Sequence, residues 1–300
     1  MMVADERLVL RVSEMSRLAG ASVARMGAGR VHSVFRRCFN ITGQSGDWLT
    51  VAVAPFPRTP DGVIVETREN GPDFSPWSGV EAGMAVVLAP GEIWIPDAGL
   101  ALALADAKIF DTRREPFART VRNDGRAARN LALAREVIRR RGRVCDAPEF
   151  HRRAAPALAA LREGILANDA ATMRAQCEAL LGLGVGLTPS GDDILGGIAA
   201  GLFLGGAAGD KNRFLPVLRQ LLRDDGRTTD VSARSLRLCA NGEINAVVFE
   251  TARAILCEGK VETEREVSVL LKQGGTSGTE TAQGLCLGLQ LAGETGETTI

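Results

Sequence analysis

A glycine-rich stretch in the second half of the chain carries the residues best suited to binding or catalysis. It reads GLGVGLTPSGDDILGGIAAGLFLGG over residues 182–206. Pro189 disfavours the helical conformation at the residue before it, so we expect extended chain that becomes helical at Ser190. Ser190 is a favoured N-cap residue, and Asp193, three residues later, resembles the acidic member of a capping box. Asp192 and Asp193 also place negative charge where a helix dipole is positive.

A fainter copy of this pattern lies near the C-terminus. It reads GTSGTETAQGLCLGLQLAG from Gly275. The aligned pairs are Ser190 with Ser277, Gly191 with Gly278, Asp193 with Glu280, Gly197 with Gly284 and Gly201 with Gly288. Glycine at every fourth position leaves a bare stripe along one side of a helix. We therefore expect two glycine-striped helices that pack on each other and bring both turns to one site.

Three interpretations of the Asp192–Asp193 pair remain open. In the first, the aspartates only stabilise the start of a core helix. In the second, they hold Mg²⁺, which prefers carboxylate oxygens and bridges to phosphate. In the third, they accept hydrogen bonds from an amide or carbamoyl NH₂ group, while Ser190 and the backbone of residues 184–191 hold ligand oxygens. A bare anion is disfavoured, because a carboxylate about 4 Å away costs roughly 4 kcal/mol and a helix dipole returns about 0.3–2 kcal/mol.

The candidate site residues follow from these two turns and from one early segment. The predicted catalytic residues are Ser190, Asp192 and Asp193, and the tentative Mg²⁺ ligands are Asp192 and Asp193. The predicted substrate-binding residues are Gly184, Gly186, Thr188, Gly191, Thr276, Ser277, Gly278 and Glu280. His32, Ser33 and Asn40, from the run VHSVFRRCFN, are predicted to line a pocket. The alternative for His32 is a structural histidine on a strand. No cofactor other than Mg²⁺ is expected.

Several other chemistries are disfavoured by the residues present. The chain has two histidines and no tyrosine, and no G-x-S-x-G elbow accompanies them, which argues against a Ser-His-Asp hydrolase. Neither histidine lies at ligand spacing from a cysteine or the other histidine, so zinc is not expected. The G-L-G-V-G run follows a predicted helix and precedes no G-K-[ST], so it indicates neither a dinucleotide fold nor a P-loop.

Composition points to a globular cytoplasmic protein. The 300 residues are 45% apolar, and the 36 basic and 36 acidic residues give no net charge. We therefore expect no nucleic acid and no anionic membrane among the partners. Six cysteines without a C-x-x-C pair indicate reduced thiols. The N-terminus does not resemble a signal peptide, and the charge-free run at residues 194–209 is too short to span a bilayer.

Periodicity predicts an α+β protein. Short β-branched or aromatic segments at residues 31–42, 48–55, 62–67 and 83–96 indicate an antiparallel sheet or small barrel, preceded by a helix from Val12 to Met26. Helical spacing of apolar residues then follows almost without interruption. The expected helices cover residues 127–141, 148–166, 170–181, 191–204, 211–223, 230–240, 246–257, 262–272 and 279–291. The predicted domains are a β-rich domain at residues 1–125 and a helical domain with the GLTPSGDD motif at residues 126–300.

Taken together, these motifs resemble a known family. GLGVGLTPSGDDILGG, VHSVFRRCFNI, the T-x-x-S-x-x-x-L segment at Thr229–Leu236 and GGTSGTETAQGL are similar to AllH-type proteins, which are associated with oxamate carbamoyltransferase. The resemblance implies a cytosolic subunit of a multi-subunit enzyme of allantoin and purine nitrogen catabolism. That enzyme converts oxalurate and phosphate to oxamate and carbamoyl phosphate. The implied partners are other subunits of a carbamoyltransferase complex and a small polar carboxylate or carbamoyl ligand.

A second function class remains open beside this one. The chain lacks the S-T-R-T-R signature that binds carbamoyl phosphate in ordinary carbamoyltransferases. The run SARSLR at residues 232–237 is only partly similar to that signature. The alternative is a non-catalytic scaffold or small-ligand-sensing subunit of a cytosolic complex. In that case the glycine-striped helices are expected to form an interaction surface.

Overall fold

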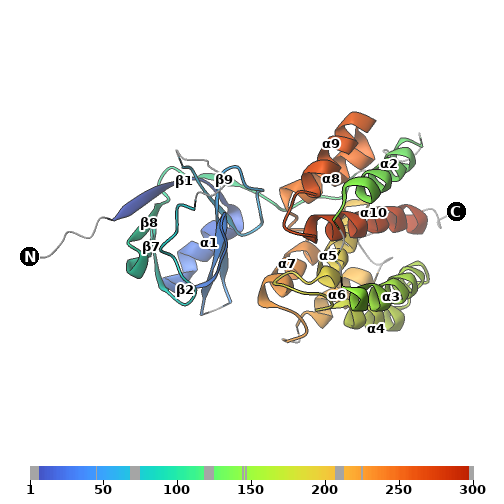
Figure 1. Ribbon diagram of the computed structural model, residues 1–300, viewed down its shortest axis with the longest axis horizontal. Coiled ribbons are helices and arrows are strands. Elements are labelled where there is room, and N and C mark those ends of the chain that lie inside the picture. The colour runs from blue at the N-terminus through green and yellow to red at the C-terminus, as the bar shows by residue number, and fades with distance from the viewer. Residues whose placement is uncertain are drawn as a thin grey trace, which may run out of the picture. The chain divides into compact units, whose positions relative to one another are not determined.

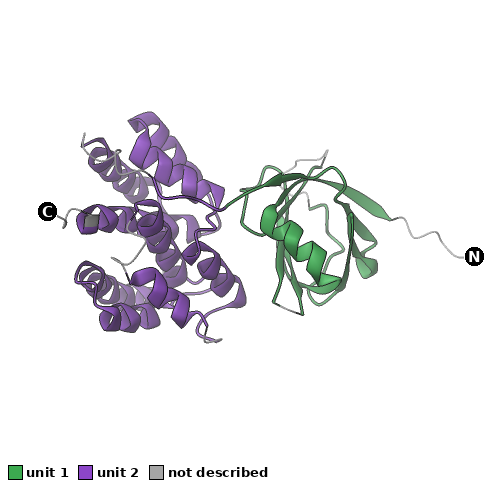
Figure 2. Ribbon diagram, turned by 180° about the vertical axis from the view of Figure 1, so that it is seen from behind, with its two compact units in different colours: residues 1–112 green, residues 113–300 purple. Residues whose placement is uncertain are grey.

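The computed structural model describes residues 7–44, 46–67, 75–117, 125–143, 145, 147–206, 213–223 and 226–296. Strands dominate the first part of the chain and helices the second (Figure 1), which confirms the predicted α+β class. The chain divides into two compact units, residues 1–112 and 113–300 (Figure 2). The domain boundary predicted between residues 125 and 126 stays a prediction, because residues 118–124 lie outside the described part of the chain.

The first unit is a barrel-like sheet. Its described strands are β1 (Leu8–Ser16), β2 (Ala28–Val34), β3 (Cys38–Gly43), β4 (Trp48–Val53), β5 (Gly62–Val65), β6 (Ala85–Ala89), β7 (Glu92–Ile95), β8 (Leu100–Ala103) and β9 (Lys108–Phe110). Their order is β5-β4-β3-β2-β6-β7-β8-β1-β9, and β1 also pairs with β5, which closes a ring. Antiparallel pairs dominate, but β1 is parallel to β8 and β9, and β4 is parallel to β5. The predicted small barrel is confirmed, with mixed pairing.

The predicted first helix is wrong over its N-terminal part. β1 extends to Ser16, and α1 (Arg17–Met26) begins where the Ser16 hydroxyl accepts the Ala19 N–H at 2.9 Å. Val12 and Met15 belong to the barrel core. The pairing of β1 with β5 shifts register between Val12 and Glu14, so both apolar side chains reach the same face of the strand. This irregularity reproduces the three-residue spacing of a helix.

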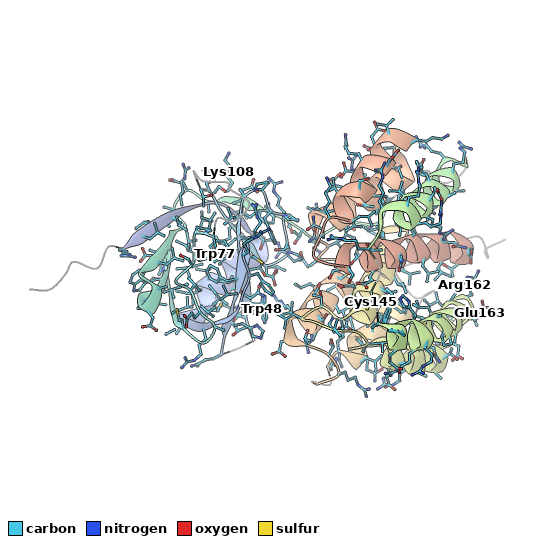
Figure 3. All side chains as sticks on the ribbon, viewed as in Figure 1. Trp48, Trp77, Lys108, Cys145, Arg162 and Glu163 are labelled. Carbon is cyan, nitrogen blue, oxygen red and sulfur yellow. The ribbon has the colours of Figure 1, made fainter. Side chains whose placement is uncertain are left out.

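Alternating side chains fill the barrel. Phe39 and Ile41 of β3 and Leu49 of β4 are fully buried in its core. Trp77, labelled inside the barrel in Figure 3, packs edge-on against Phe39 with ring centroids 5.2 Å apart. Because strand side chains alternate between faces, the polar residues between these core positions point away from the core. Strands β8 and β9 were not predicted, since the alanine-rich run ALALA has little strand propensity.

The second unit is mainly helical in its described part. Its helices are α2 (Arg126–Arg141), α3 (Pro148–Leu166), α4 (Ala170–Leu180), α5 (Ser190–Leu204), α6 (Phe214–Leu221), α7 (Asp230–Ala240), α8 (Ala246–Cys257), α9 (Lys260–Leu270) and α10 (Ser277–Gly296). They coincide with the predicted helices to within a few residues at each end. One core lies mainly among α3, α4, α5, α6 and α7, and another among α2, α8, α9 and α10. α5 and α10 contribute to both cores and lie side by side (Figure 1).

Glycine stripes join α5 to α10. A Cβ added to Gly197 would lie 2.2 Å from a carbonyl oxygen of α10, and one added to Gly284 would lie 2.1 Å from a carbonyl oxygen of α5. For Gly201 and Gly288 the corresponding distances are 2.6 and 2.4 Å. The two backbones can approach so closely only because glycine has no side chain. The predicted glycine-to-glycine packing of the two helices is confirmed.

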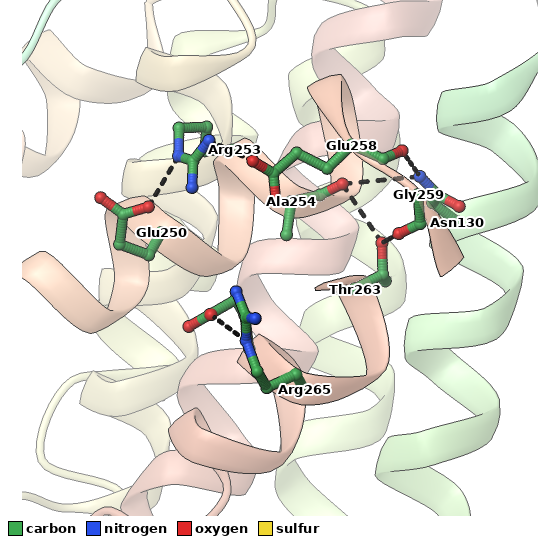
Figure 4. A network of polar contacts seen from close by, with 9 residues as sticks. Asn130, Glu250, Arg253, Ala254, Glu258, Gly259, Thr263 and Arg265 are labelled. Carbon is green, nitrogen blue, oxygen red and sulfur yellow. Dashed lines mark hydrogen bonds and ion pairs between the residues drawn. The ribbon is translucent and has the colours of Figure 1, made fainter. Parts of the chain in front are cut away.

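A buried polar network holds α2, α8 and α9 together (Figure 4). The Asn130 side chain donates to the Ile255 and Glu258 carbonyl oxygens at 3.1 and 3.0 Å. The Thr263 hydroxyl donates to the Ala254 oxygen at 3.2 Å. These bonds give the Ile255 and Glu258 carbonyl groups at the end of α8 a partner, and the Ala254 carbonyl group, which also accepts the Glu258 N–H, a second one. They hold together helices of the second core, to which α10 also belongs.

Two further expectations concern the chain as a whole. All six cysteines are free thiols, and burial raises the pKa of Cys177, Cys239 and Cys286 to about 12. Thiols of this kind stay protonated and are poor nucleophiles.

Within the part of the chain that the structure describes, no helix is both long enough and apolar enough to cross a membrane.

Candidate functional site

The two predicted turns meet at the starts of α5 and α10. The hydroxyl oxygens of Thr188 and Ser277 are 2.9 Å apart and share a hydrogen bond. Both hydroxyls also lie close enough to the Asp193 carboxyl group to lower its pKa. Side chains from the two turns therefore form one polar cluster, although 89 positions separate Thr188 from Ser277 along the chain. The expectation that the repeated motifs would come together is confirmed.

Glycine shapes the loop before α5. Gly182, Gly184 and Gly186 have φ angles of 73°, 128° and 86°, which side-chain-bearing residues rarely adopt. A Cβ on Gly184 would also lie 2.6 Å from the Ser190 nitrogen, so the loop folds back tightly onto the helix start. The substrate-binding roles of Gly184 and Gly186 stay predictions.

Ser190 is not the N-cap of α5. Pro189 occupies that position, and no side chain makes a cap hydrogen bond there. The Pro189 carbonyl oxygen instead accepts the N–H groups of Asp192 and Asp193 at 2.9 and 3.1 Å. Ser190 is the first helical residue and is buried. The capping-box prediction for Asp193 is also wrong, because the N-cap residue Pro189 has no N–H group for an acidic side chain to bind.

The glycine that follows each serine has a steric explanation. A Cβ on Gly191 would lie 2.1 Å from the Leu180 oxygen, and one on Gly278 would lie 2.0 Å from the Leu270 oxygen. Leu180 ends α4 and Leu270 ends α9. Each helix of the repeat therefore starts directly against the end of the helix before it, where only glycine fits. The N–H groups of both glycines donate to carbonyls of the preceding loops, and their predicted contacts with substrate stay predictions.

Asp192 is engaged within its own turn. Its Oδ1 accepts the Gly182 N–H at 2.8 Å, and its Oδ2 accepts the Thr228 hydroxyl. Burial raises the pKa of Asp192, although the bonds from Thr228, Gly182 and Ser232 act in the opposite direction. Asp192 thus ties the glycine-rich loop to the start of α7. This arrangement is the one expected if Asp192 has a structural role.

Asp193 and Glu280, the equivalent acidic residues of the two motifs, form the acidic part of the cluster. Glu280 is 3% exposed, and its Oε2 accepts the Thr276 hydroxyl at 2.9 Å. Asp193 Oδ2 and Glu280 Oε1 are buried, and no donor among the described residues reaches them. Burial, together with the negative charges of Glu280 and Asp192, raises the pKa of Asp193 to about 8. Asp193 therefore holds its proton at neutral pH.

The described residues do not fit a Mg²⁺ site. No group of three or more histidine, cysteine, aspartate or glutamate side chains in the described chain is placed to hold one ion. A metal at Asp192 would have to displace the Gly182 and Thr228 donors. Mg²⁺ requires near-octahedral oxygen coordination and gives up its water ligands reluctantly. The two unpaired oxygens of Asp193 and Glu280 are better matched to hydrogen-bond donors.

His32, Ser33 and Asn40 come together on the barrel. A register shift between Val31 and Ser33 makes His32 the extra residue of a β-bulge, and His32 Nδ1 lies 3.2 Å from Ser33 Oγ. Asn40 Nδ2 donates to Ser33 Oγ at 2.9 Å, and the Thr50 hydroxyl donates to Asn40 Oδ1 at 3.0 Å. The three predicted residues thus belong to one hydrogen-bonded row across β2, β3 and β4. Bulges often occur where a strand re-aims a functional side chain.

Several partners in these clusters were not predicted as site residues. They are Thr50 and Asp61 in the barrel, Thr228 just before α7 and Ser232 in its first turn. Thr50 is directly opposite Asn40 in the β3–β4 register, and a single sequence does not reveal strand register. The hydroxyl-rich run RTTDVSARSLR was the available signal for Thr228 and Ser232, because such runs are typical of helix starts.

Two family models match the chain. The model described as oxamate carbamoyltransferase subunit AllH matches residues 180–289, and the AllH family N-terminal domain matches residues 2–109. The chain belongs to the AllH family. In this AllH-family chain, the first match begins at the last residue of α4 and includes both turns, and the second covers the barrel. The family description is that of an oxamate carbamoyltransferase subunit. No curated protein and no solved structure gave a match.

Proposed function

We propose that this chain is a subunit of an oxamate carbamoyltransferase that converts oxalurate and phosphate to oxamate and carbamoyl phosphate in allantoin and purine nitrogen catabolism. The ligand binds where the two turns of the helical unit meet. The observation that carries the proposal is the hydrogen-bonded cluster of Thr188, Ser277 and Asp193. All three residues lie within the range matched by the carbamoyltransferase-subunit model.

Each part of the cluster has a role in this proposal. The hydroxyls of Thr188, Thr276 and Ser277 and the backbone of the glycine-rich loop bind oxygen atoms of the ligand. Asp193 and Glu280 contact the group that reacts. Ser190 and Asp192 act as positioning residues, since Ser190 begins α5 and Asp192 ties the loop to α7.

The hydrogen-bonded row on the barrel is proposed, within the first unit by itself, to contact a small polar ligand. His32 and Ser33 are adjacent in sequence, and the bulge lets their side chains bond to each other. The Ser33 oxygen accepts a hydrogen bond from Asn40, and the tautomer of His32 decides whether Ser33 or His32 donates in the bond between them. A polarised hydroxyl of this kind is a good donor or acceptor for a small carboxylate or carbamoyl compound.

Other subunits complete the proposed enzyme, and the word subunit in the family description supports this part of the proposal. The proposed location is the cytoplasm, a reducing compartment in which thiols such as the free cysteines of this chain persist. Val185 and Leu187, on the glycine-rich loop, are 75% and 39% exposed. The alternative of a scaffold or ligand-sensing subunit would use exposed side chains of this kind. The glycine stripes cannot be the surface of such a scaffold, because α5 and α10 bury them against each other.

Titration calorimetry of the full chain separates the proposed function from a pure scaffold. We expect binding heat with oxamate, oxalurate or carbamoyl phosphate, and no requirement for Mg²⁺. Ser277→Ala should weaken binding about tenfold, the effect of losing roughly one hydrogen bond. Ser268→Ala is the matched control, because that hydroxyl bonds to the Glu264 carbonyl within α9. A scaffold without a ligand site gives no heat with any of the three compounds.

A further inference from the structure

We infer that Asp193 and Glu280 together recognise the NH₂ group and carbonyl oxygen of a primary amide, and so select carbamoyl and oxamate groups over the corresponding carboxylates. This inference rests on the proposed function and adds the ligand group that the acid pair binds. The two residues occupy equivalent positions of the repeated motif, one at the start of α5 and one at the start of α10.

The first support is the pair of unsatisfied buried oxygens. Glu280 uses Oε2 to accept the Thr276 hydroxyl, and the Ser277 and Thr188 hydroxyls, which share one hydrogen bond, lie close enough to Asp193 to lower its pKa. Asp193 Oδ2 and Glu280 Oε1 are each buried without a donor among the described residues. Buried polar atoms in folded proteins are nearly always hydrogen-bonded. One carboxyl oxygen at each of the two helix starts therefore has no hydrogen-bond partner among the described residues, and a ligand with both donors and an acceptor would supply partners for them.

The second support is the charge of the pair. Burial raises the pKa of Asp193, and the nearby negative charges of Glu280 and Asp192 raise it further, to about 8. The side chain is therefore a neutral carboxyl group at neutral pH, with one O–H donor beside its acceptor oxygens. A ligand carboxylate or phosphate placed here would meet the negative charge of Glu280, whereas a neutral amide would not.

The third support is the match between donors and acceptors. A primary amide has two N–H donors and one carbonyl acceptor. The Asp193 carboxyl can donate to the amide oxygen, and Glu280 Oε1 can accept an amide N–H. An ammonium ion has no acceptor, so it would leave the Asp193 O–H unsatisfied. An anionic end of the same ligand would be favoured near the hydroxyls and the positive ends of the α5 and α10 dipoles.

Oxamate and oxalate test the inference directly. The two compounds differ only in that the amide NH₂ of oxamate is replaced by O⁻ in oxalate, which makes that end of oxalate a second carboxylate. We expect calorimetry of the full chain at pH 7 to show that oxamate binds at least tenfold more tightly than oxalate. Glu280→Gln should remove most of this preference, since the substituted side chain no longer repels the second carboxylate. Glu264→Gln is the matched control on α9, where Glu264 is half-exposed and pairs with Arg141, and it should keep the preference. Thermal unfolding of each variant checks that it is folded.

The outcomes distinguish the inference from the proposed function. Equal affinity of the wild-type chain for oxamate and oxalate overturns the inference and leaves the proposed function standing. A preference that Glu280→Gln leaves unchanged also overturns it, because selectivity would then come from other residues. If oxamate, oxalurate and carbamoyl phosphate all fail to bind the wild-type chain, the proposed function fails together with the inference.

Discussion

Gly284→Ala is expected to lower the free energy of unfolding of the helical unit by about 3 kcal/mol or more, at the upper end of the effects of overpacking. The added Cβ would lie 2.1 Å from the Ile194 oxygen, 2.9 Å from the Ile194 carbonyl carbon and 3.0 Å from the Ile198 nitrogen. All three are backbone atoms of α5, and a helix backbone cannot swing aside as the end of a flexible side chain can. The two helices would have to separate, which would also pull the two turns apart.

Gly293→Ala is the matched control on the same helix. No atom lies within 4 Å of a Cβ at that position, so the substitution gains helix propensity, worth up to about 1 kcal/mol, without a clash. Urea unfolding of both variants measures the difference. If Gly284→Ala is as stable as the wild-type chain, then α5 and α10 are not in backbone contact and the arrangement of the site is wrong.

Asp193→Asn is expected to reduce turnover of oxalurate by about 10²–10⁴-fold, the usual contribution of a general acid. When phosphate displaces oxamate from the carbamoyl carbon of oxalurate, the departing amide anion must take up a proton. Its negative charge is shared between nitrogen and oxygen, so the Asp193 carboxyl group that faces the amide oxygen can donate that proton. Asp193 is protonated at neutral pH because burial and two neighbouring carboxylates raise its pKa to about 8. Asparagine keeps the size and neutrality of the carboxyl group but cannot release a proton. Binding of oxamate should therefore survive better than catalysis.

The measurement is phosphorolysis of oxalurate by the chain assembled with its partner subunits. Activity of the wild type should fall as the pH rises through about 8, because Asp193 then loses the proton that it must donate. Asp106→Asn is the control, since Asp106 is an exposed side chain that approaches Arg11 only at 3.8 Å. Full turnover by Asp193→Asn, with unchanged stability, would rule out a catalytic role for this residue.

Much of the helical unit could be predicted because its local signals agree with its packing. Helix boundaries such as Pro148–Leu166 and Asp230–Ala240 follow directly from apolar spacing and from proline or a capping threonine at the start. β1 was misread because the irregularity near Val12 gives a strand the spacing of a helix. The parallel pairing of β1 with β8 joins segments far apart in sequence, and periodicity carries no information about such partners.

The location of the site could be predicted from the sequence, but the orientation of its side chains could not. The repeated serine, glycine and acidic residues indicated that two turns would meet, and Thr188 and Ser277 do so. Sequence alone could not separate the roles of Asp192 and Asp193, because neighbouring residues on a helix point about 100° apart. Asp192 faces Thr228 and the glycine-rich loop, whereas Asp193 faces the second turn. That difference depends on where α7 and α10 pack, and both helices are distant in sequence from the motif that contains the two aspartates.

A crystal structure of the full chain grown with oxamate tests the central claim most directly. We predict oxamate between the two turns, with its amide nitrogen within hydrogen-bonding distance of Glu280 Oε1 and its amide oxygen facing the Asp193 carboxyl group. Oxamate bound elsewhere, or Thr188 and Ser277 separated with no ligand between them, would contradict this account of the protein.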